Sequence, residues 1–151
     1  GASVADDLSE SFTNAWRCDP IAAFGGIVSL SGVVDSKLSE IIASGEKFLE
    51  VIVAPSFSEG AIEKLTTRWK NIRLLAVGNS QRQQQWQQLR SIEGGILMQE
   101  LKPVTADPSQ WGHVAGPKPT DDQLQNATLA WIACAHLKSN SISPKFGRIV
   151  S

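Results

Sequence analysis

Two short stretches hold the residues whose types and spacing could do chemistry. The first is Phe24-Gly25-Gly26, which lies between the turn-forming Asp19-Pro20 and an apolar, β-branched run. An aromatic face beside accessible backbone amides suits a flat heteroaromatic ligand. A turn that leads into a strand uses the same residues, because glycine tolerates positive φ and close backbone approach. Local composition alone favours the turn over the ligand site.

The second stretch is Lys138-Ser139-Asn140, which follows the last apolar helical pattern of the chain. Serine and asparagine together offer the donors and acceptors that an amide-bearing ligand requires. A helix C-cap is the alternative, and the local pattern favours it, since asparagine accepts the left-handed conformation that ends many helices. The familiar catalytic signatures G-x-S-x-G, G-x-G-x-x-G and H-E-x-x-H do not occur in the sequence.

The composition excludes several classes of partner. The chain has 151 residues, 42% of them hydrophobic, and a formal net charge of −1. This is enough for one domain with a sizeable core, and without a basic field we expect no nucleic-acid partner. Two histidines and two distant cysteines form no cluster of ligands, so we expect no metal. No apolar run approaches the ~20 residues of a membrane span, and we expect a cytoplasmic protein that does not bind membranes.

Alternating patterns predict the elements that position these stretches. Short, wholly apolar strands separated by amphipathic helices are typical of an α/β layer with parallel pairing. We expect helices over 5–16, over 35–43 with Asp35 as cap, and from Ser58 to Trp69, with strands over 27–30, 51–54 and 72–77. In the helix after Ser58 the inward side chains are expected to be Ala61, Ile62, Leu65 and Trp69. The fold class is therefore α/β, a three-layer domain with a mixed, mostly parallel sheet.

The second half of the chain is less regular. We expect the glutamine-rich stretch 81–89 to be a solvated helix or linker, and 96–98 to be a fourth strand that completes a core over 1–101. Prolines and glycines make 102–119 an irregular connection. Thr120 opens a capping-box pattern for a helix over 120–138, and 139–151 is a tail. All of these segments belong to a single α/β lobe over 1–151.

Several uncommon sequence blocks, in a fixed order, resemble one family. DPIAAFGGIVSLSGVVD resembles a family pattern DPxSAFGGIxAxNxxVD, and FLEVIVAPSFSEGAIEKL resembles FxEVxxAPxFxxxAxxxL. GGILMQ is similar to GGLLVQ, and PTDDQLQNATLAWIACAHLKSNSI resembles PTxxExxDLxFAWxVxKHxKSNAI. These patterns belong to the formyltransferase part of the AICAR transformylase/IMP cyclohydrolase family, which is bifunctional in purine biosynthesis. The matching blocks cover most of the chain and correspond to the first lobe of that part.

The resemblance implies a cytidine-deaminase-like fold and a formyl transfer. In the family, 10-formyltetrahydrofolate is the co-substrate that supplies the formyl group, and the amino group of the imidazole carboxamide ribonucleotide AICAR receives it. That amine is a weak nucleophile, so the reaction needs removal of its proton and stabilisation of the charge that develops on the formyl oxygen. The implied partners are these small molecules and a second copy of the protein, as a homodimer.

The resemblance also assigns roles to residues of this chain. Asn140 is the implied catalytic residue, through hydrogen bonds around the carboxamide and the reacting amine. The implied substrate-binding residues are Ile21, Phe24 and Gly25, which would line the folate and imidazole pocket, with Lys138 and Ser139 shaping the turn at Asn140.

The departures from the family pattern limit what this chain is expected to do. Gly1 matches the glycine that ends the family's KHxNPCG stretch, so the catalytic Lys-His pair lies ahead of it in that pattern. After KSNSI the chain reads SPKFGRIVS, where the family continues into a second lobe with GIGxGQxSR. We therefore expect the 151 residues alone to be inactive. A stand-alone nucleotide- or folate-binding regulatory module, or a purely structural domain, are the alternatives.

Overall fold

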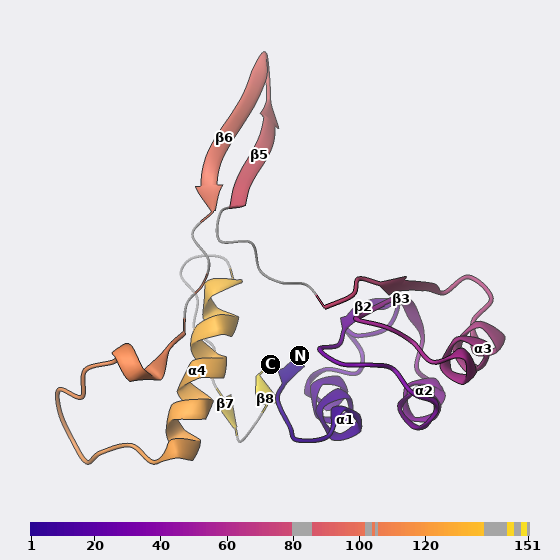
Figure 1. Cartoon of the computed structure of the whole chain (residues 1–151), viewed down its shortest axis with the longest axis horizontal. Coiled ribbons are helices and arrows are strands. Elements are labelled where there is room, and N and C mark those ends of the chain that lie inside the picture. The colour runs from indigo at the N-terminus through magenta and orange to yellow at the C-terminus, as the bar shows by residue number, and fades with distance from the viewer. Residues whose placement is uncertain (80–85, 102–103, 105, 138–144, 147–148, 151) are drawn as a thin grey trace.

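The computed structural model describes residues 1–79, 86–101, 104, 106–137, 145–146 and 149–150. Figure 1 shows a lobe that runs from α1 to β4, a β5–β6 hairpin that projects away from it, and a separate helix α4. In chain order the elements are β1 (Ala2–Ser3), α1 (Leu8–Cys18), β2 (Gly26–Ser29), α2 (Ser36–Ala43), β3 (Leu49–Ala54), α3 (Glu59–Arg68), β4 (Arg73–Ala76), β5 (Trp86–Ile92), β6 (Gly95–Leu101), the 3-10 turn η1 (Pro108–Gln110), α4 (Asp121–Ala135), β7 (Lys145–Phe146) and β8 (Ile149–Val150).

The helices begin where the sequence provides a capping side chain. An Asp35 carboxylate oxygen accepts a hydrogen bond from the Leu38 backbone N–H at 2.8 Å, and the Ser58 hydroxyl accepts one from Ala61 at 3.3 Å. Thr120 and Gln123 form a reciprocal capping box at the start of α4. Each cap satisfies an N–H group that the first turn of a helix leaves without a partner. The three predicted helix starts are confirmed.

Three parallel strands form the sheet of the lobe, in the order β2-β3-β4. In the register, Val28 lies beside Ile52, and Ile52 lies beside Leu74. The helices α2 and α3 are the crossovers between successive strands, as parallel pairing requires. The predicted α/β class and the parallel pairing of these three strands are confirmed.

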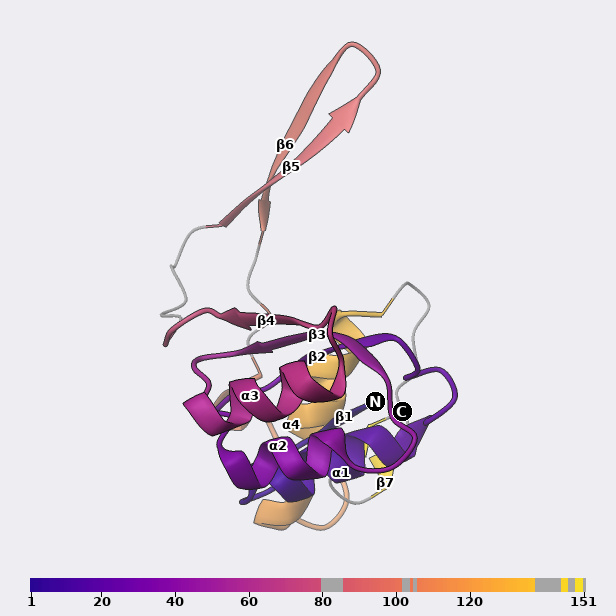
Figure 2. The same cartoon turned by 90° about the vertical axis from the view of Figure 1, so that its right-hand side faces the viewer.

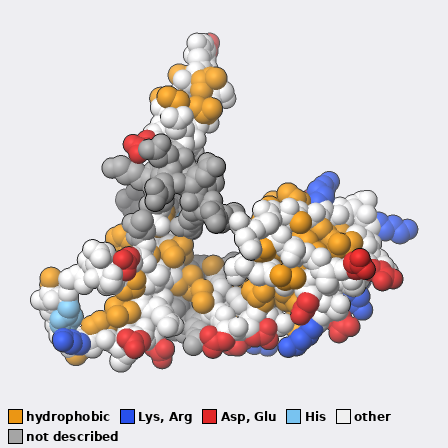
Figure 3. All heavy atoms as spheres, in the orientation of Figure 1, with side chains coloured by type: hydrophobic (Ala, Val, Ile, Leu, Met, Phe, Trp, Pro, Cys, Tyr) orange, Lys and Arg blue, Asp and Glu red, His pale blue; other side chains and the backbone are white. Residues whose placement is uncertain are grey.

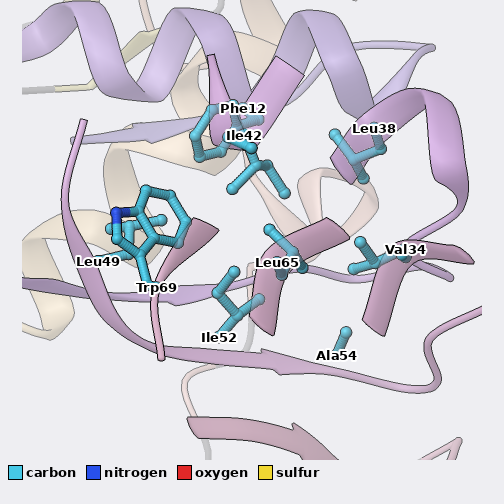
Figure 4. Close-up of a cluster of buried hydrophobic side chains, with 11 residues drawn as sticks. Phe12, Val34, Leu38, Ile42, Leu49, Ile52, Ala54, Leu65 and Trp69 are labelled. Atoms are coloured by element: carbon cyan, nitrogen blue, oxygen red, sulfur yellow. The ribbon is translucent and has the colours of Figure 1, made fainter. Parts of the chain in front are cut away.

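The core of the lobe lies between this sheet and its helices (Figure 4). Full burial of each large aliphatic side chain stabilises the folded state by about 1.5–3 kcal/mol. The buried hydrophobic residues are Phe12, Val34, Leu38, Ile42, Ala43, Leu49, Ile52, Ala54, Ala61, Leu65 and Trp69.

The helices α1, α2 and α3 cover one face of the β2-β3-β4 sheet (Figure 2). Side chains that alternate away from the core, such as Ile27 and Leu75, are exposed, Ile27 to 73%. The described residues of the lobe therefore form two layers. The third layer and the cytidine-deaminase-like topology stay predictions.

Two expectations for single segments are wrong. Ile62 is 44% exposed rather than inward, because Ala61 and Leu65 already occupy the buried face of α3 and Ile62 lies about 100° around the helix from Ala61. In the glutamine-rich stretch 81–89, residues 81–85 lie outside the described residues, but 86–89 belong to strand β5 and not to a helix or linker.

The strand expected at 96–98 exists, but it pairs with β5 rather than with the lobe. It is part of β6, which runs antiparallel to β5 with Leu89 opposite Met98. Gly94, at φ 80°, allows the tight turn between the strands. Figure 3 shows hydrophobic side chains on the surface of this hairpin. Its sheet is separate from the parallel one, so hydrogen bonds to a neighbouring strand, and not local composition, decide the conformation of 86–89.

The helix expected over 120–138 is confirmed as α4, Asp121–Ala135. None of its residues is buried, and the ring of Trp131 meets that of Trp111 at a centroid distance of 6.0 Å. Between the hairpin and α4, the described part of 102–119 is irregular apart from the single turn η1, as expected. Near the chain ends, Ala2 pairs antiparallel with Val150 in a small sheet.

Candidate functional site

The segment that connects α1 to β2 is a pair of hydrogen-bonded turns. Asp19 ends α1, and its carboxylate accepts a hydrogen bond from the Ala22 backbone N–H at 2.9 Å. The Ala23 N–H donates to the Asp19 carbonyl at 3.1 Å, and the Gly26 N–H donates to the Ala23 carbonyl at 3.0 Å. These bonds hold the backbone between Asp19 and Gly26 in one conformation, which projects the side chains of Ile21 and Phe24 outward.

The two adjacent glycines of this segment serve different physical needs. Gly25 has φ 71°, in the left-handed region that side-chain-bearing residues rarely adopt, although a Cβ there would meet only ordinary contacts. At Gly26 the limit is space, since a Cβ would lie 2.8 Å from the Ala23 carbonyl oxygen. Replacing either glycine would therefore disturb the turn that carries Phe24.

The side chain of Phe24 is presented at the surface against a second aromatic ring. It is 67% exposed, and its ring centroid lies 5.2 Å from that of Phe48 with the planes inclined by 45°. The Gly25 backbone N–H donates to the Phe48 carbonyl at 3.0 Å. We call the two rings of Phe24 and Phe48 the aromatic wall. Tilted pairs at this separation are a favourable arrangement of ring quadrupoles, and the exposed face is available to a flat ligand.

Two cavities are lined in part by residues of this segment, and neither Phe24 nor Phe48 lines either of them. The first, of about 540 Å³, is lined by Gly1, Ala2 and Ser3 together with Trp16, Ala23 and Gly26. The second, of about 510 Å³, is lined by Trp16, Arg17, Ile21, Ile41, Glu46 and Lys47. Both volumes are within the usual range for small-molecule sites. Trp16 lines both cavities, so the two spaces share this indole and could each hold part of an extended ligand.

Lys47 brings a positive charge to the second cavity. Its ammonium group donates to the Ile41 carbonyl at 3.3 Å, and to the Ser44 carbonyl and hydroxyl at 2.8 and 3.1 Å. It also lies 5.9 Å from the centroid of the Trp16 ring. Partial burial lowers the pKa of Lys47. Because this ammonium stabilises the C-terminal carbonyls of α2, its first role is structural.

The structure places half of the site residues expected from the sequence. Ile21, Phe24 and Gly25 lie together in one segment, with Ile21 89% exposed at the second cavity. Lys138, Ser139 and Asn140 lie outside the described residues.

His136, which precedes them, is the C-cap of α4, and its Nδ1 lies 2.8 Å from the Ile132 carbonyl oxygen. This contact with the last turn of α4 accounts for the position of the histidine.

Sequence reasoning missed Phe48, the second ring of the aromatic wall. A signal exists, because adjacent parallel strands bring their amino ends to the same edge of a sheet. Gly26 is in register with Leu49, so the residues just before them, Gly25 and Phe48, are neighbours. The wall therefore stands at the amino ends of β2 and β3, and not in the crevice at the carboxyl ends where open parallel sheets usually bind ligands.

Two kinds of feature do not occur in the part of the chain that the structure covers. Among the described residues, no group of three or more histidine, cysteine, aspartate or glutamate side chains could hold a metal ion. Within the same residues, no helix is both long enough and apolar enough to cross a membrane.

Fold and site together define a class of protein. It is an α/β lobe with a parallel sheet, in which a glycine-containing turn before strand β2 displays an aromatic ring, while other residues of the same turn line two cavities of ligand size. Residues 1–146 match the model of one family, described as the AICARFT/IMPCHase bienzyme. The chain belongs to this family, and the resemblance seen in its sequence blocks is confirmed.

Three relatives give the same result. The chain is 39% identical over 142 residues to the Bifunctional purine biosynthesis protein PurH of Anoxybacillus flavithermus, and 36% identical over 142 residues to that of Bacillus cereus. It is 36% identical over 145 residues to that of Rhodopirellula baltica. The alignments cover 94% of this chain but 27% of the first two relatives and 28% of the third. The chain thus spans about a quarter of the length of these relatives.

Proposed function

We propose that these residues are part of an AICAR formyltransferase of purine biosynthesis. The reaction moves a formyl group from 10-formyltetrahydrofolate to the amino group of AICAR. The observation that carries the proposal is the family match over residues 1–146, which includes the segment that displays Phe24. An exposed aromatic ring, on a turn whose other residues line two cavities of ligand size, is consistent with a substrate that carries flat heterocycles.

The proposed roles follow the family pattern residue by residue. Phe24 provides the flat face for a heterocycle, Gly25 lets the backbone turn so that this face is presented, and Ile21 adds apolar surface at the second cavity. Asn140 is the proposed catalytic residue, which orients the carboxamide and the reacting amine by hydrogen bonds. Lys138 and Ser139 shape its turn. Positioning of this kind matters, because small displacements of a reacting group can cost orders of magnitude in rate.

The proton transfer is assigned to residues outside this sequence. The family's Lys-His pair stands five to six positions ahead of the glycine that matches Gly1, which is about 20 Å of extended chain at most. Gly1, Ala2 and Ser3 line the first cavity beside Ala23 and Gly26, so such a pair would be within reach of it. We therefore propose that residues 1–151 alone bind substrate without turnover. In the whole protein we propose a cytoplasmic homodimer that acts on these small molecules.

The test combines an activity assay with titration calorimetry. Residues 1–151 are assayed for formyl transfer with AICAR and 10-formyltetrahydrofolate, and titrated separately with AICAR and with tetrahydrofolate. We expect no turnover but measurable binding of tetrahydrofolate. Phe24→Ala should weaken that binding about tenfold, since a lost aromatic contact of this size costs about 1.4 kcal/mol.

Each other outcome contradicts a stated part of the proposal. Robust turnover would show that the Lys-His pair is not required. The absence of a binding signal in the titrations with AICAR and with tetrahydrofolate would favour a purely structural domain. Binding that Phe24→Ala leaves unchanged would remove the aromatic wall from the site.

A further inference from the structure

We propose that Phe48 is a positioning residue that sets the orientation of the Phe24 ring, and so controls binding of the flat ligand. This inference rests on the proposed function. It concerns a residue that contributes no proposed contact to the substrate and acts through another side chain.

Phe48 holds the Phe24 segment at two points. Its ring pairs with the ring of Phe24 at a centroid distance of 5.2 Å and an angle of 45°. Its carbonyl accepts the hydrogen bond from the Gly25 N–H at 3.0 Å. One contact fixes the backbone immediately after Phe24, and the other fixes the side chain itself.

An exposed aromatic ring needs such a support if it is to serve as a binding face. Phe24 is 67% exposed, and exposed side chains change rotamer on the picosecond to nanosecond timescale. A ligand that stacks on a mobile ring must first immobilise it, which reduces affinity. Pairing with Phe48 already restricts the Phe24 ring in the free protein, so less conformational entropy is lost when the ligand binds.

Phe48 is itself well anchored, so it can act as the support. It is partly buried and packs against the core of the lobe. The residue before Phe48 in the chain, Lys47, donates hydrogen bonds to the Ile41 and Ser44 carbonyls at the end of α2. The residue after it, Leu49, is almost fully buried and begins β3. The aromatic wall therefore has a rigid inner ring and an exposed outer ring.

The binding test is a double-mutant cycle with tetrahydrofolate as the probe. Phe48→Ala should weaken its binding about threefold to tenfold, the fold-change that corresponds to the energy of an aromatic pair. In a Phe24→Ala background the same change should have an effect of less than about twofold, because the group through which Phe48 acts is gone. Equal effects in both backgrounds would overturn the proposal.

A matched control and a milder variant separate positioning from stability. Phe57 is also partly buried against the core, and Phe57→Ala should lower stability without changing tetrahydrofolate affinity. Phe48→Leu keeps most of the packing volume but removes the ring, so it should still weaken tetrahydrofolate binding. Phe48→Tyr keeps the ring and should bind tetrahydrofolate as tightly as the wild type. An affinity that follows the melting temperature across these variants would contradict a positioning role.

A second readout does not depend on ligand binding. With 4-fluorophenylalanine incorporated, the ¹⁹F resonance of Phe24 is assigned from its loss in Phe24→Ala. We expect Phe48→Leu to shift it towards the position of the free amino acid, and Phe57→Ala to leave it in place. An unchanged resonance in Phe48→Leu would overturn the inference. If the wild-type chain does not bind tetrahydrofolate but the resonance shifts as expected, the proposed function fails while the support of Phe24 by Phe48 stands.

Discussion

The lobe from α1 to β4 and the segments that follow it differ in where their apolar side chains go. Every buried side chain among the described residues lies between Ser9 and Trp69. The hairpin and α4 are also rich in apolar residues, but none of their described side chains is buried. Ile52 in β3 is fully buried, whereas Ile96 in β6 is 69% exposed.

This difference arises from neighbours rather than from composition. In the lobe, each helix and strand turns its apolar side towards another element of the same lobe. The two-stranded hairpin has no such neighbour among the described residues, and a hairpin of this kind is marginally stable in water by itself. The free energy of unfolding of residues 1–151 should therefore be that of the lobe.

The largest expected effect contrasts two isoleucines. Ile52→Ala should reduce the free energy of unfolding by about 2–5 kcal/mol, because it removes transfer energy and leaves a cavity. Ile96→Ala, the matched change in the hairpin, should alter it by less than about 0.5 kcal/mol. Urea unfolding followed by tryptophan fluorescence measures both. Similar losses would mean that the hairpin is buried in solution, and the contrast between the regions would then be wrong.

An intermediate effect is expected at the helix caps. Ser58→Ala removes the cap of α3 and should cost about 1 kcal/mol. Thr120→Ala removes one half of the capping box of α4, but it should leave the unfolding of the lobe unchanged because α4 contributes no buried side chain. Near-UV circular dichroism during denaturation tests this. A loss at Thr120 as large as at Ser58 would show that α4 unfolds together with the lobe.

The smallest effect concerns two similar aspartates. Hydrogen bonding from Ser9 lowers the pKa of Asp7 below 3.8 with help from Lys37, and hydrogen bonding from Ser109 lowers that of Asp107. A depressed carboxyl pKa adds stability above its unfolded value, and this stability is lost as the pH falls through the folded value. Asp7 caps α1 in the lobe, whereas Asp107 caps η1 outside it.

Asparagine substitutions separate the charge from the cap, because asparagine is a comparable N-cap that does not titrate. The difference in unfolding free energy between the wild type and Asp7→Asn should be larger at pH 6 than at pH 3. For Asp107→Asn it should be close to zero at both values. Equal pH dependence of the two variants would assign both aspartates to the same cooperative unit.

Features that depend on a few consecutive residues could be predicted from the sequence. Asp35, Ser58 and Thr120 were identified as caps because a cap is a contact between residues two or three apart. Strand β5 was missed because its conformation depends on hydrogen bonds to β6, and glutamine-rich sequence has no pattern that reports such a partner. Ile62 was misplaced because helical periodicity does not say how wide the buried face is.

The candidate site divides in the same way. Phe24 and Gly25 could be found because an aromatic residue and a glycine pair are adjacent in sequence and match a family block. Phe48 opens another family block, but the block does not show that it lies beside Phe24, because that contact depends on the pairing of β2 with β3. Trp16 reaches the two cavities only through the packing of α1.

By itself, the sequence determined the membership of the family, the α/β class, the helix caps and the turn at Phe24. These depend on residue order and on interactions that span a few positions. Only the tertiary structure decided that Phe48 stands beside Phe24, that Trp16 lines two cavities, and that the lobe has a buried core while no described side chain of the hairpin is buried. The physical reason is that burial and ring contacts are made between residues distant in sequence, and the chain must fold before their partners are defined.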